Sequence, residues 1–118
     1  MEPIFVNYSN HPSGLWEKEQ TQEAERMGRI VDMPFPHVDP LLSEEEVRAL
    51  GDQAVEEIMD KSPAAVMCQG EFTLCQYVVE KLKERGVKVV AACSARETFM
   101  DGDKKISRFY FVKFRRYL

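Results

Sequence analysis

Hydrophobic positions follow two periods along this chain, which predicts alternating strands and helices. Short apolar or β-branched runs predict four strands, at residues 3–8, 29–35, 64–68 and 87–93. Between them, apolar side chains recur at helical spacing over residues 16–27, from Ser43 to the Ser62-Pro63 step, and over residues 74–82. Gly28 and Gly86 end the first and third helices, and Ser43 with Glu46 forms a capping box at the start of the second.

This alternation is typical of a mainly parallel sheet with helices on both faces. Right-handed crossovers then give a Rossmann-like α/β three-layer sandwich. The last part of the chain predicts a C-terminal β-hairpin, in which residues 97–100 and 106–114 flank the turn at residues 101–103. The basic residues at 113–116 are expected on an outer strand. We expect a single domain spanning residues 1–118.

Ligands of such sheets bind beyond the carboxyl ends of the strands, near the point where the strand order reverses. Three predicted loops follow strands at that edge, at residues 9–13, 69–73 and 94–96. Each contains small polar side chains or an arginine. These loops are therefore the candidate binding site, although no glycine-rich dinucleotide or triphosphate motif is present.

In the first loop, the candidate ligand-binding residues are Ser9, Asn10 and Ser13. Asn10 can read a base edge or a ribose hydroxyl, because its amide both donates and accepts hydrogen bonds. His11 can donate to a phosphate or exchange a proton near neutral pH. The alternative is that Ser13 only caps the first helix and Asn10 only forms a turn. We expect Trp16, in the first turn of that helix, to pack rather than to stack on a base.

In the second loop, Gln69 is expected to point into the crevice, and Gly70 allows close approach of a ligand to the backbone. Thr73 can cap the following helix or offer its hydroxyl to a phosphate. The alternative is that Thr73 is only a cap, Glu71 a favourable acid in the first helical turn, and Gln69 a solvated side chain.

The third loop pairs Ser94 with Arg96, whose guanidinium fork suits a phosphate. A surface arginine paired with a nearby acid is the alternative. Asp32 and Asp39 are candidates for general-base chemistry, but no residue in the sequence pairs with them.

A net charge of -4 argues against binding to duplex nucleic acid but leaves a small anionic ligand open. No apolar stretch is long enough to cross a membrane, and residues 1–9 lack a signal-peptide pattern, so we expect a cytoplasmic protein. We expect Cys68 and Cys93 to be buried reduced thiols, and Cys75, near a helix start, to be inert. We expect no metal site and no cofactor, since His11 and His37 have no cysteine pair nearby.

Several of these segments resemble small CRISPR-associated proteins of the CARF-like type. The similarity is carried by residues 5–13, 31–36 and 69–74 and by the basic-aromatic C-terminal strand, and it covers most of the chain. It implies a Rossmann-like homodimer that binds a cyclic oligoadenylate, a small cyclic RNA messenger, across the two-fold axis. It also implies that the chain can be a ring nuclease that degrades the messenger.

Metal-free cleavage requires a ribose 2′-hydroxyl held in line with its phosphate, and positioning and charge stabilisation supply most of the rate. Our hypothesis is that Arg96, Ser9 and the N–H groups at the first helix hold the phosphate, with His11 as acid or base. His11 and Arg96 are then the candidate catalytic residues.

Three alternatives remain open at this point. The chain can be a non-catalytic sensor of the messenger, or a small enzyme acting on a mononucleotide or sugar phosphate. The third is a protein-interaction role for the strand at 106–117, in which an exposed edge with Phe109, Phe111 and Phe114 pairs with another chain or forms the dimer contact.

Overall fold

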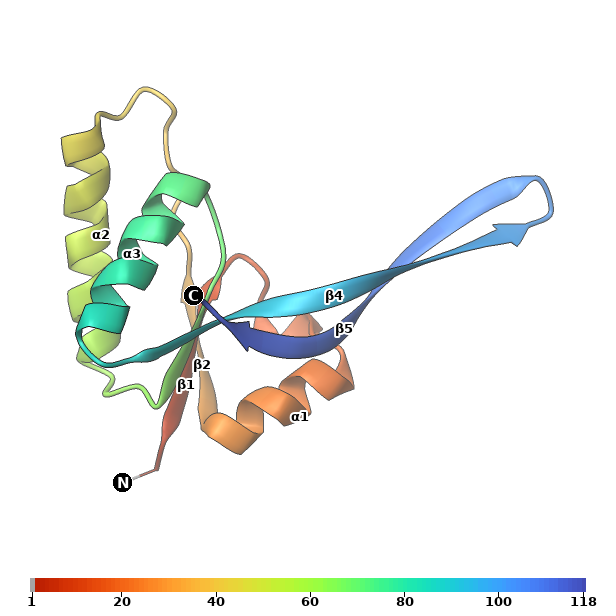
Figure 1. The fold of residues 1–118 in the computed structure, drawn as a ribbon, viewed down its shortest axis with the longest axis horizontal. Helices are drawn as coiled ribbons and strands as arrows, with labels where there is room; N and C mark the ends of the chain where they lie inside the picture. Colours follow the sequence, from red (N-terminus) through yellow and green to blue (C-terminus); the bar gives the residue numbers. More distant parts are fainter. Residues whose placement is uncertain (1) are drawn as a thin grey trace.

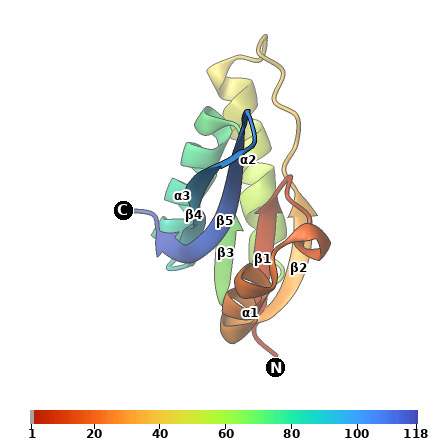
Figure 2. The same ribbon diagram turned by 90° about the vertical axis from the view of Figure 1, so that its right-hand side faces the viewer.

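Five strands form one sheet in the order β2-β1-β3-β4-β5 (Figures 1 and 2). The structure is a computed structural model that describes residues 2–118. The strands are β1 (Ile4–Ser9), β2 (Arg29–Pro34), β3 (Ala65–Cys68), β4 (Lys88–Asp101) and β5 (Lys104–Arg116). The first four pair in parallel, whereas β5 runs antiparallel to β4. The predicted α/β fold, a mainly parallel sheet with a C-terminal hairpin, is therefore confirmed.

Helices cover both faces of this sheet (Figure 2). Helix α1 (Lys18–Met27) lies on one face, whereas α2 (Glu44–Met59) and α3 (Phe72–Glu84) lie together on the other. Alternate side chains of a strand point to opposite faces, so β1 supplies Phe5 to the core beneath α1 and Val6 to the larger core beneath α2 and α3. No helix within residues 2–118 has the length and apolarity needed to cross a membrane.

The predicted capping box of α2 is present. The Glu46 N–H donates to Ser43 Oγ and the Ser43 N–H donates to Glu46 Oε1, each at 3.1 Å. At the end of α1, the N–H of Gly28 donates to the Ala24 carbonyl, as a C-terminal cap does. These local signals place the helices because they satisfy the backbone groups that a helix end leaves without a partner.

The third predicted loop, at residues 94–96, does not exist as a loop. Ser94 and Arg96 lie inside β4, which continues without a break from Lys88 to Asp101 and is paired with β5 from Val90 to Asp101. A register shift between Cys93 and Ser94 marks the point where the strand bends. Beyond it, β4 and β5 form a two-stranded ribbon that projects from the sheet and closes at Gly102, whose φ is +65° (Figure 1). Residues 94–96 have no strand pattern of their own, and they adopt the strand conformation because they pair with β5.

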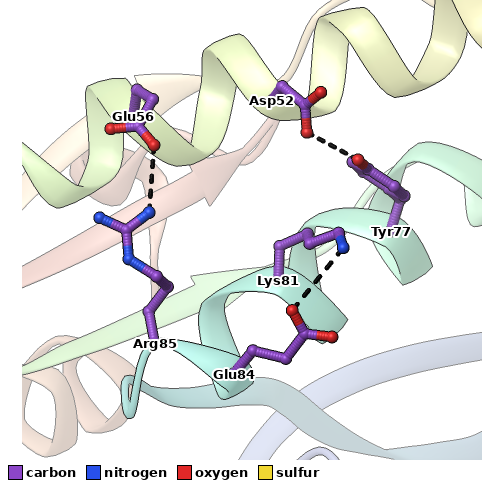
Figure 3. A network of polar contacts seen from close by, with 6 residues as sticks. All are labelled: Asp52, Glu56, Tyr77, Lys81, Glu84 and Arg85. Carbon is purple, nitrogen blue, oxygen red and sulfur yellow. Dashed lines mark hydrogen bonds and ion pairs between the residues drawn. The ribbon is translucent and has the colours of Figure 1, made fainter.

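Helices α2 and α3 pack through a glycine and an aromatic ring. A Cβ atom added to Gly51 would meet the ring of Tyr77, so any larger residue here requires that ring to move. The Tyr77 hydroxyl donates to Asp52 at 2.6 Å, and Arg85 pairs with Glu56 at 3.0 Å across the same interface (Figure 3). These polar pairs are exposed and stabilise the interface little, because solvent screens them.

We expect Gly51→Ala to lower the free energy of unfolding by about 1 kcal/mol, since the new methyl group displaces the Tyr77 ring. In a Tyr77→Ala background the same substitution should raise it by about 0.5–1 kcal/mol, because alanine is the better helix former. Urea unfolding of the wild type, both single variants and the double variant measures this coupling. Equal effects of Gly51→Ala in both backgrounds would contradict the packing explanation.

Candidate functional site

The strand order reverses between β1 and β3. The chain leaves β1 and returns through α1 to β2, whereas it leaves β3 and returns through α3 on the opposite face to β4. The two loops that follow β1 and β3 therefore diverge and leave a crevice between them. This is the position at which open α/β sheets with the strand order 2-1-3-4 bind their ligands.

Two adjoining cavities lie at this edge of the sheet, and we call them together the strand-end hollow. Their volumes are about 510 Å³ and about 340 Å³, within the range of about 300–1,000 Å³ usual for small-molecule sites. Both are lined by Asn10, His11 and Gln69. The larger also contacts Gly70, Phe72, Cys75, Ala91 and Tyr117, and the smaller contacts Trp16, Gln20 and Ser94 among others. The structure therefore brings together residues of the first two predicted loops.

A buried amide in β1 holds the first loop in place. Asn7 is 1% exposed, and its Nδ2 donates to the His11 carbonyl and to Asp32 Oδ1, each at 2.9 Å. Its Oδ1 accepts a hydrogen bond of 2.6 Å from Ser9 Oγ, which in turn accepts from the His11 N–H at 3.1 Å. The backbone of His11 is thus bound on both sides, while its imidazole stays exposed in the hollow. Ser9, one of the predicted ligand-binding residues, is almost completely buried and supports the loop.

Asp32 extends this network to the short 3₁₀ helix η1 (Ser13–Leu15). Its carboxylate accepts from the Ser13 hydroxyl at 3.1 Å and from the Ser13 N–H at 3.2 Å. The sequence suggested no partner for Asp32, and this was wrong, because the parallel register of β1 and β2 places it beside Asn7. Ser13 does not cap a helix, since its hydroxyl donates to Asp32 instead.

Trp16 anchors the same loop from the other side. It lies between η1 and α1 rather than in the first turn of α1, and its Nε1 donates to the His11 carbonyl at 2.9 Å. The ring centroid lies 6.4 Å from those of Phe5 and Phe114, so the predicted packing role is confirmed.

Gln69 lines both cavities of the hollow. Its Oε1 accepts a hydrogen bond from the Ala92 N–H, which joins the end of β3 to β4 beyond the last paired residues. The predicted position of this side chain in the crevice therefore agrees with the structure, although its oxygen already has a protein partner. Within residues 2–118 the Gln69 Nε2 group has no protein acceptor and is available to a ligand.

The glycine after Gln69 is explained by packing. A Cβ atom on Gly70 would lie 2.5 Å from the ring of Phe35, which is buried and packs at a tilt against Tyr8 with centroids 4.8 Å apart. Phe35 therefore already occupies the side of Gly70 where a side chain would lie.

Helix α3 is capped by Glu71 rather than by Thr73. The Glu71 carboxylate accepts from the backbone N–H groups of Leu74 and Thr73 at 2.9 and 3.0 Å and from the Thr73 hydroxyl at 2.7 Å. These bonds, the one from Leu74 above all, lower the pKa of the Glu71 carboxyl. Thr73 lines two other cavities, beside α2 and beside the C-terminus, and it does not line the strand-end hollow.

Arg96 lies next to the hollow without lining it. Ser94 contacts the smaller cavity, and Arg96 follows two residues later on the same face of β4, about 7 Å farther along the strand. The Arg96 guanidinium donates to Ser107 Oγ at 2.9 Å and lies over the Phe109 ring. Among the described residues, no lysine or arginine lines the hollow, and no three His, Cys, Asp or Glu side chains form a metal-binding cluster.

Sequence reasoning missed two residues that build this site, Asn7 and Tyr117. An asparagine in the middle of an apolar strand is a usable signal, because a buried amide must find hydrogen-bond partners. Tyr117 lies one residue after β5 and reaches the end of β3, where its hydroxyl donates to the Cys68 carbonyl at 2.6 Å. A contact between residues so far apart in the sequence leaves no local pattern.

We expect Asn7→Ala to lower the free energy of unfolding by about 2–3 kcal/mol, because it leaves the buried Ser9 hydroxyl without its acceptor and removes the hydrogen bonds from Asn7 to the His11 carbonyl and to Asp32. The exposed Asn10→Ala is the matched control and should change stability by less than about 0.5 kcal/mol. Urea unfolding followed by circular dichroism measures both. If the two variants were equally stable, the Asn7 network would not hold the loop.

Comparison with known proteins gives a family for this chain but no activity. No curated protein and no solved structure matches it. One family model matches residues 3–115, nearly the whole chain, and its description names neither a ligand nor a reaction. The similarity to CARF-like proteins therefore stays a prediction. The chain belongs to the family described as the uncharacterized protein MJ1673 family.

Proposed function

We propose that this protein binds a cyclic oligoadenylate in the strand-end hollow. The observation that carries the proposal is the convergence of Asn10, His11 and Gln69 at the point where the strand order reverses. Carboxamides read adenine well, because their donor and acceptor match its N6 and N7 atoms. Asn10 and the Nε2 group of Gln69 are the groups that we assign to this contact. The rigid backbone of residues 9–13 supports the assignment, since a preorganised loop loses little entropy on binding.

Phosphate recognition requires a positive charge that the hollow itself lacks. We assign it to Arg96, whose side chain needs only to leave Ser107 and turn back along β4 toward Ser94. A guanidinium is the side chain best shaped for two hydrogen bonds to a phosphate. Ser94, exposed at the edge of the smaller cavity, is assigned to the same phosphate.

Cleavage of the bound ring is assigned to His11. In this step the ribose 2′-oxygen attacks the adjacent phosphorus, the bond to the 5′-oxygen breaks, and a 2′,3′-cyclic phosphate forms. One proton leaves the 2′-hydroxyl and one is delivered to the departing 5′-oxygen. His11 is exposed and lines both cavities, which supports its assignment to the transfer of one of these protons without a metal.

A homodimer is part of the same proposal. The ribbon of β4 and β5 leaves large apolar side chains in solvent, with Met100 64% and Phe109 65% exposed. Both lie on the face that carries Arg96 and leads back to Ser94. A second copy packed against this face would cover them and bring its own residues toward the hollow. A two-fold dimer then matches a cyclic tetra-adenylate, which has two-fold symmetry of its own.

The sequence suggested that Phe109, Phe111 and Phe114 of the last strand contact another chain, and the structure narrows this set of residues. Phe111 is buried, and Phe114 is half-buried and packs against Phe5 with centroids 5.3 Å apart, so both side chains already have partners within the chain. Phe109 is the exposed aromatic residue of that set.

The direct test incubates the protein with radiolabelled cyclic tetra-adenylate in EDTA and reads a gel shift and a product gel together. We expect binding and linear products from the wild type. His11→Ala should retain binding and lose about 100-fold or more in cleavage rate. His37→Ala is the matched control, because this second exposed histidine lies in the loop after β2 and does not line the hollow.

Three other outcomes of this experiment would change the proposed function. A shift without products would make the protein a sensor of the messenger. Cleavage unchanged in His11→Ala would remove the role of His11. Neither binding nor cleavage, also with the hexa-adenylate ring, would overturn the proposal and favour a small nucleotide or sugar phosphate.

The oligomeric state tests, in a separate experiment, whether the ribbon of β4 and β5 forms the dimer contact. Sedimentation velocity should show a dimer for the wild type and a monomer for Phe109→Lys, because burying a lysine ammonium at the interface is costly. Leu41→Lys is the control, since Leu41 is 91% exposed in a loop away from the ribbon, and it should remain dimeric. A monomeric wild type, or a dimeric Phe109→Lys, would contradict this interface.

A further inference from the structure

Two thiols meet at the start of α3. Cys68 is the last residue of β3 and Cys75 lies in the first turns of α3, and their Sγ atoms are 3.5 Å apart. The short connection at residues 69–71 makes this possible, because the helix begins almost at once and turns Cys75 back over the strand end. The Cys75 thiol also lies 3.5 Å from the Cys68 carbonyl oxygen.

The two thiols differ in access to solvent. Cys68 is completely buried, whereas Cys75 is 7% exposed and contacts the larger cavity of the hollow. The Tyr117 hydroxyl lies 3.6 Å from the Cys75 sulfur and donates to the Cys68 carbonyl at 2.6 Å. A small molecule in the cavity therefore reaches Cys75 first, with Cys68 directly behind it.

The surroundings also favour ionisation of Cys75 over Cys68. The neighbouring Cys68 thiol above all, and then the Tyr117 hydroxyl and the Gly70 N–H, lower the pKa of the Cys75 thiol, against the effects of burial and of the Glu71 charge. Hydrogen bonding with Cys75 and burial raise the pKa of the Cys68 thiol. A thiolate is the nucleophilic form of cysteine, so the accessible sulfur is also the more reactive one.

We propose that Cys75 and Cys68 form a redox-active dithiol that reduces a small hydroperoxide and closes to an intramolecular disulfide. The Cys75 sulfur attacks one peroxide oxygen, the O–O bond breaks, and the departing oxygen takes the Cys75 proton and leaves as an alcohol or water. Cys75 is now a sulfenic acid. The Cys68 sulfur then attacks the Cys75 sulfur, the S–O bond breaks, and the hydroxide leaves as water with the Cys68 proton. The thiols lose two electrons in total, and the peroxide gains them.

The geometry requires little movement for the second step. A disulfide bond is about 2.0 Å long, so the sulfur atoms must approach by about 1.5 Å from their separation of 3.5 Å. Cys93, the third cysteine, lies in β4 and is half-buried rather than fully buried as the sequence predicted. Within residues 2–118 it has no sulfur neighbour, so it is the internal control.

The test treats the reduced full-length protein with hydrogen peroxide, alkylates the remaining thiols, and maps the peptides by mass spectrometry. We expect a linked peptide pair joining Cys68 to Cys75, with the mass of two hydrogens lost and with Cys93 still alkylated. Dithiothreitol should restore all three thiols. Cys93→Ser should behave as the wild type, Cys75→Ser should form no intramolecular disulfide, and Cys68→Ser should accumulate a sulfenic acid at Cys75 that dimedone traps.

The wild-type peptide map decides the question even if Cys68→Ser fails to fold. Oxidation of Cys93 with Cys75 left reduced, disulfides only between chains, or no sulfenic acid in a folded Cys68→Ser variant would each overturn the proposal. It is independent of the messenger, because the experiment contains no nucleotide.

Discussion

The hydrogen-bonded amide of Asn7 is the constraint on which the site depends. Asn7 lies in β1, which has parallel neighbours on both sides, and faces the same layer as Phe5. A polar group so deeply buried is tolerated only when it is fully paired, and leaving it unpaired costs about 1–3 kcal/mol. The amide meets this condition by joining Ser9, His11 and Asp32, three positions in two segments of the chain. The geometry of the first loop therefore follows from the need to satisfy one buried side chain.

Packing beneath the second loop complements this polar network. Phe35, just after β2, lies against Gly70 and Tyr8, so the loops after β2 and β3 are held together by an aromatic contact. The short connection between β3 and α3, residues 69–71, brings Cys75 over Cys68. Tyr117, near the end of the chain, lies beside Cys75. The hollow is thus bounded by a hydrogen-bonded loop on one side and a packed loop with two thiols on the other. A ligand at this position would contact both.

The sequence predicted the elements well where local patterns decide them. The Ser43 and Glu46 capping box and the uniformly apolar β3 required no tertiary information. It failed at residues 94–96, because their strand conformation comes from pairing with β5 and not from an alternating pattern of their own. At the start of α3 both Glu71 and Thr73 were competent caps, and only the structure shows that Glu71 takes that role.

The site itself was predicted in part. Asn10, His11 and Gln69 could be placed at one edge because parallel strands end together, which is a rule of topology. The hydrogen-bond partners of Asn7 and Asp32 and the sulfur pair could not be placed, because each depends on contacts across several residues or strands. Arg96 was expected at the strand ends because residues 94–96 were predicted to form a loop. These residues instead continue β4, which carries Arg96 away from the hollow.

A two-dimensional ¹H–¹⁵N spectrum recorded during titration with cyclic tetra-adenylate tests the central claim most directly. Our account predicts that the amide signals of residues 10–11, the side-chain amide of Gln69 and the backbone amide of Ala92 shift together and saturate. Signals around the separate cavity between α2 and α3, such as those of Glu44 and Tyr77, should stay in place. Shifts centred on that cavity, or no saturating shifts in the strand-end hollow, would contradict the account.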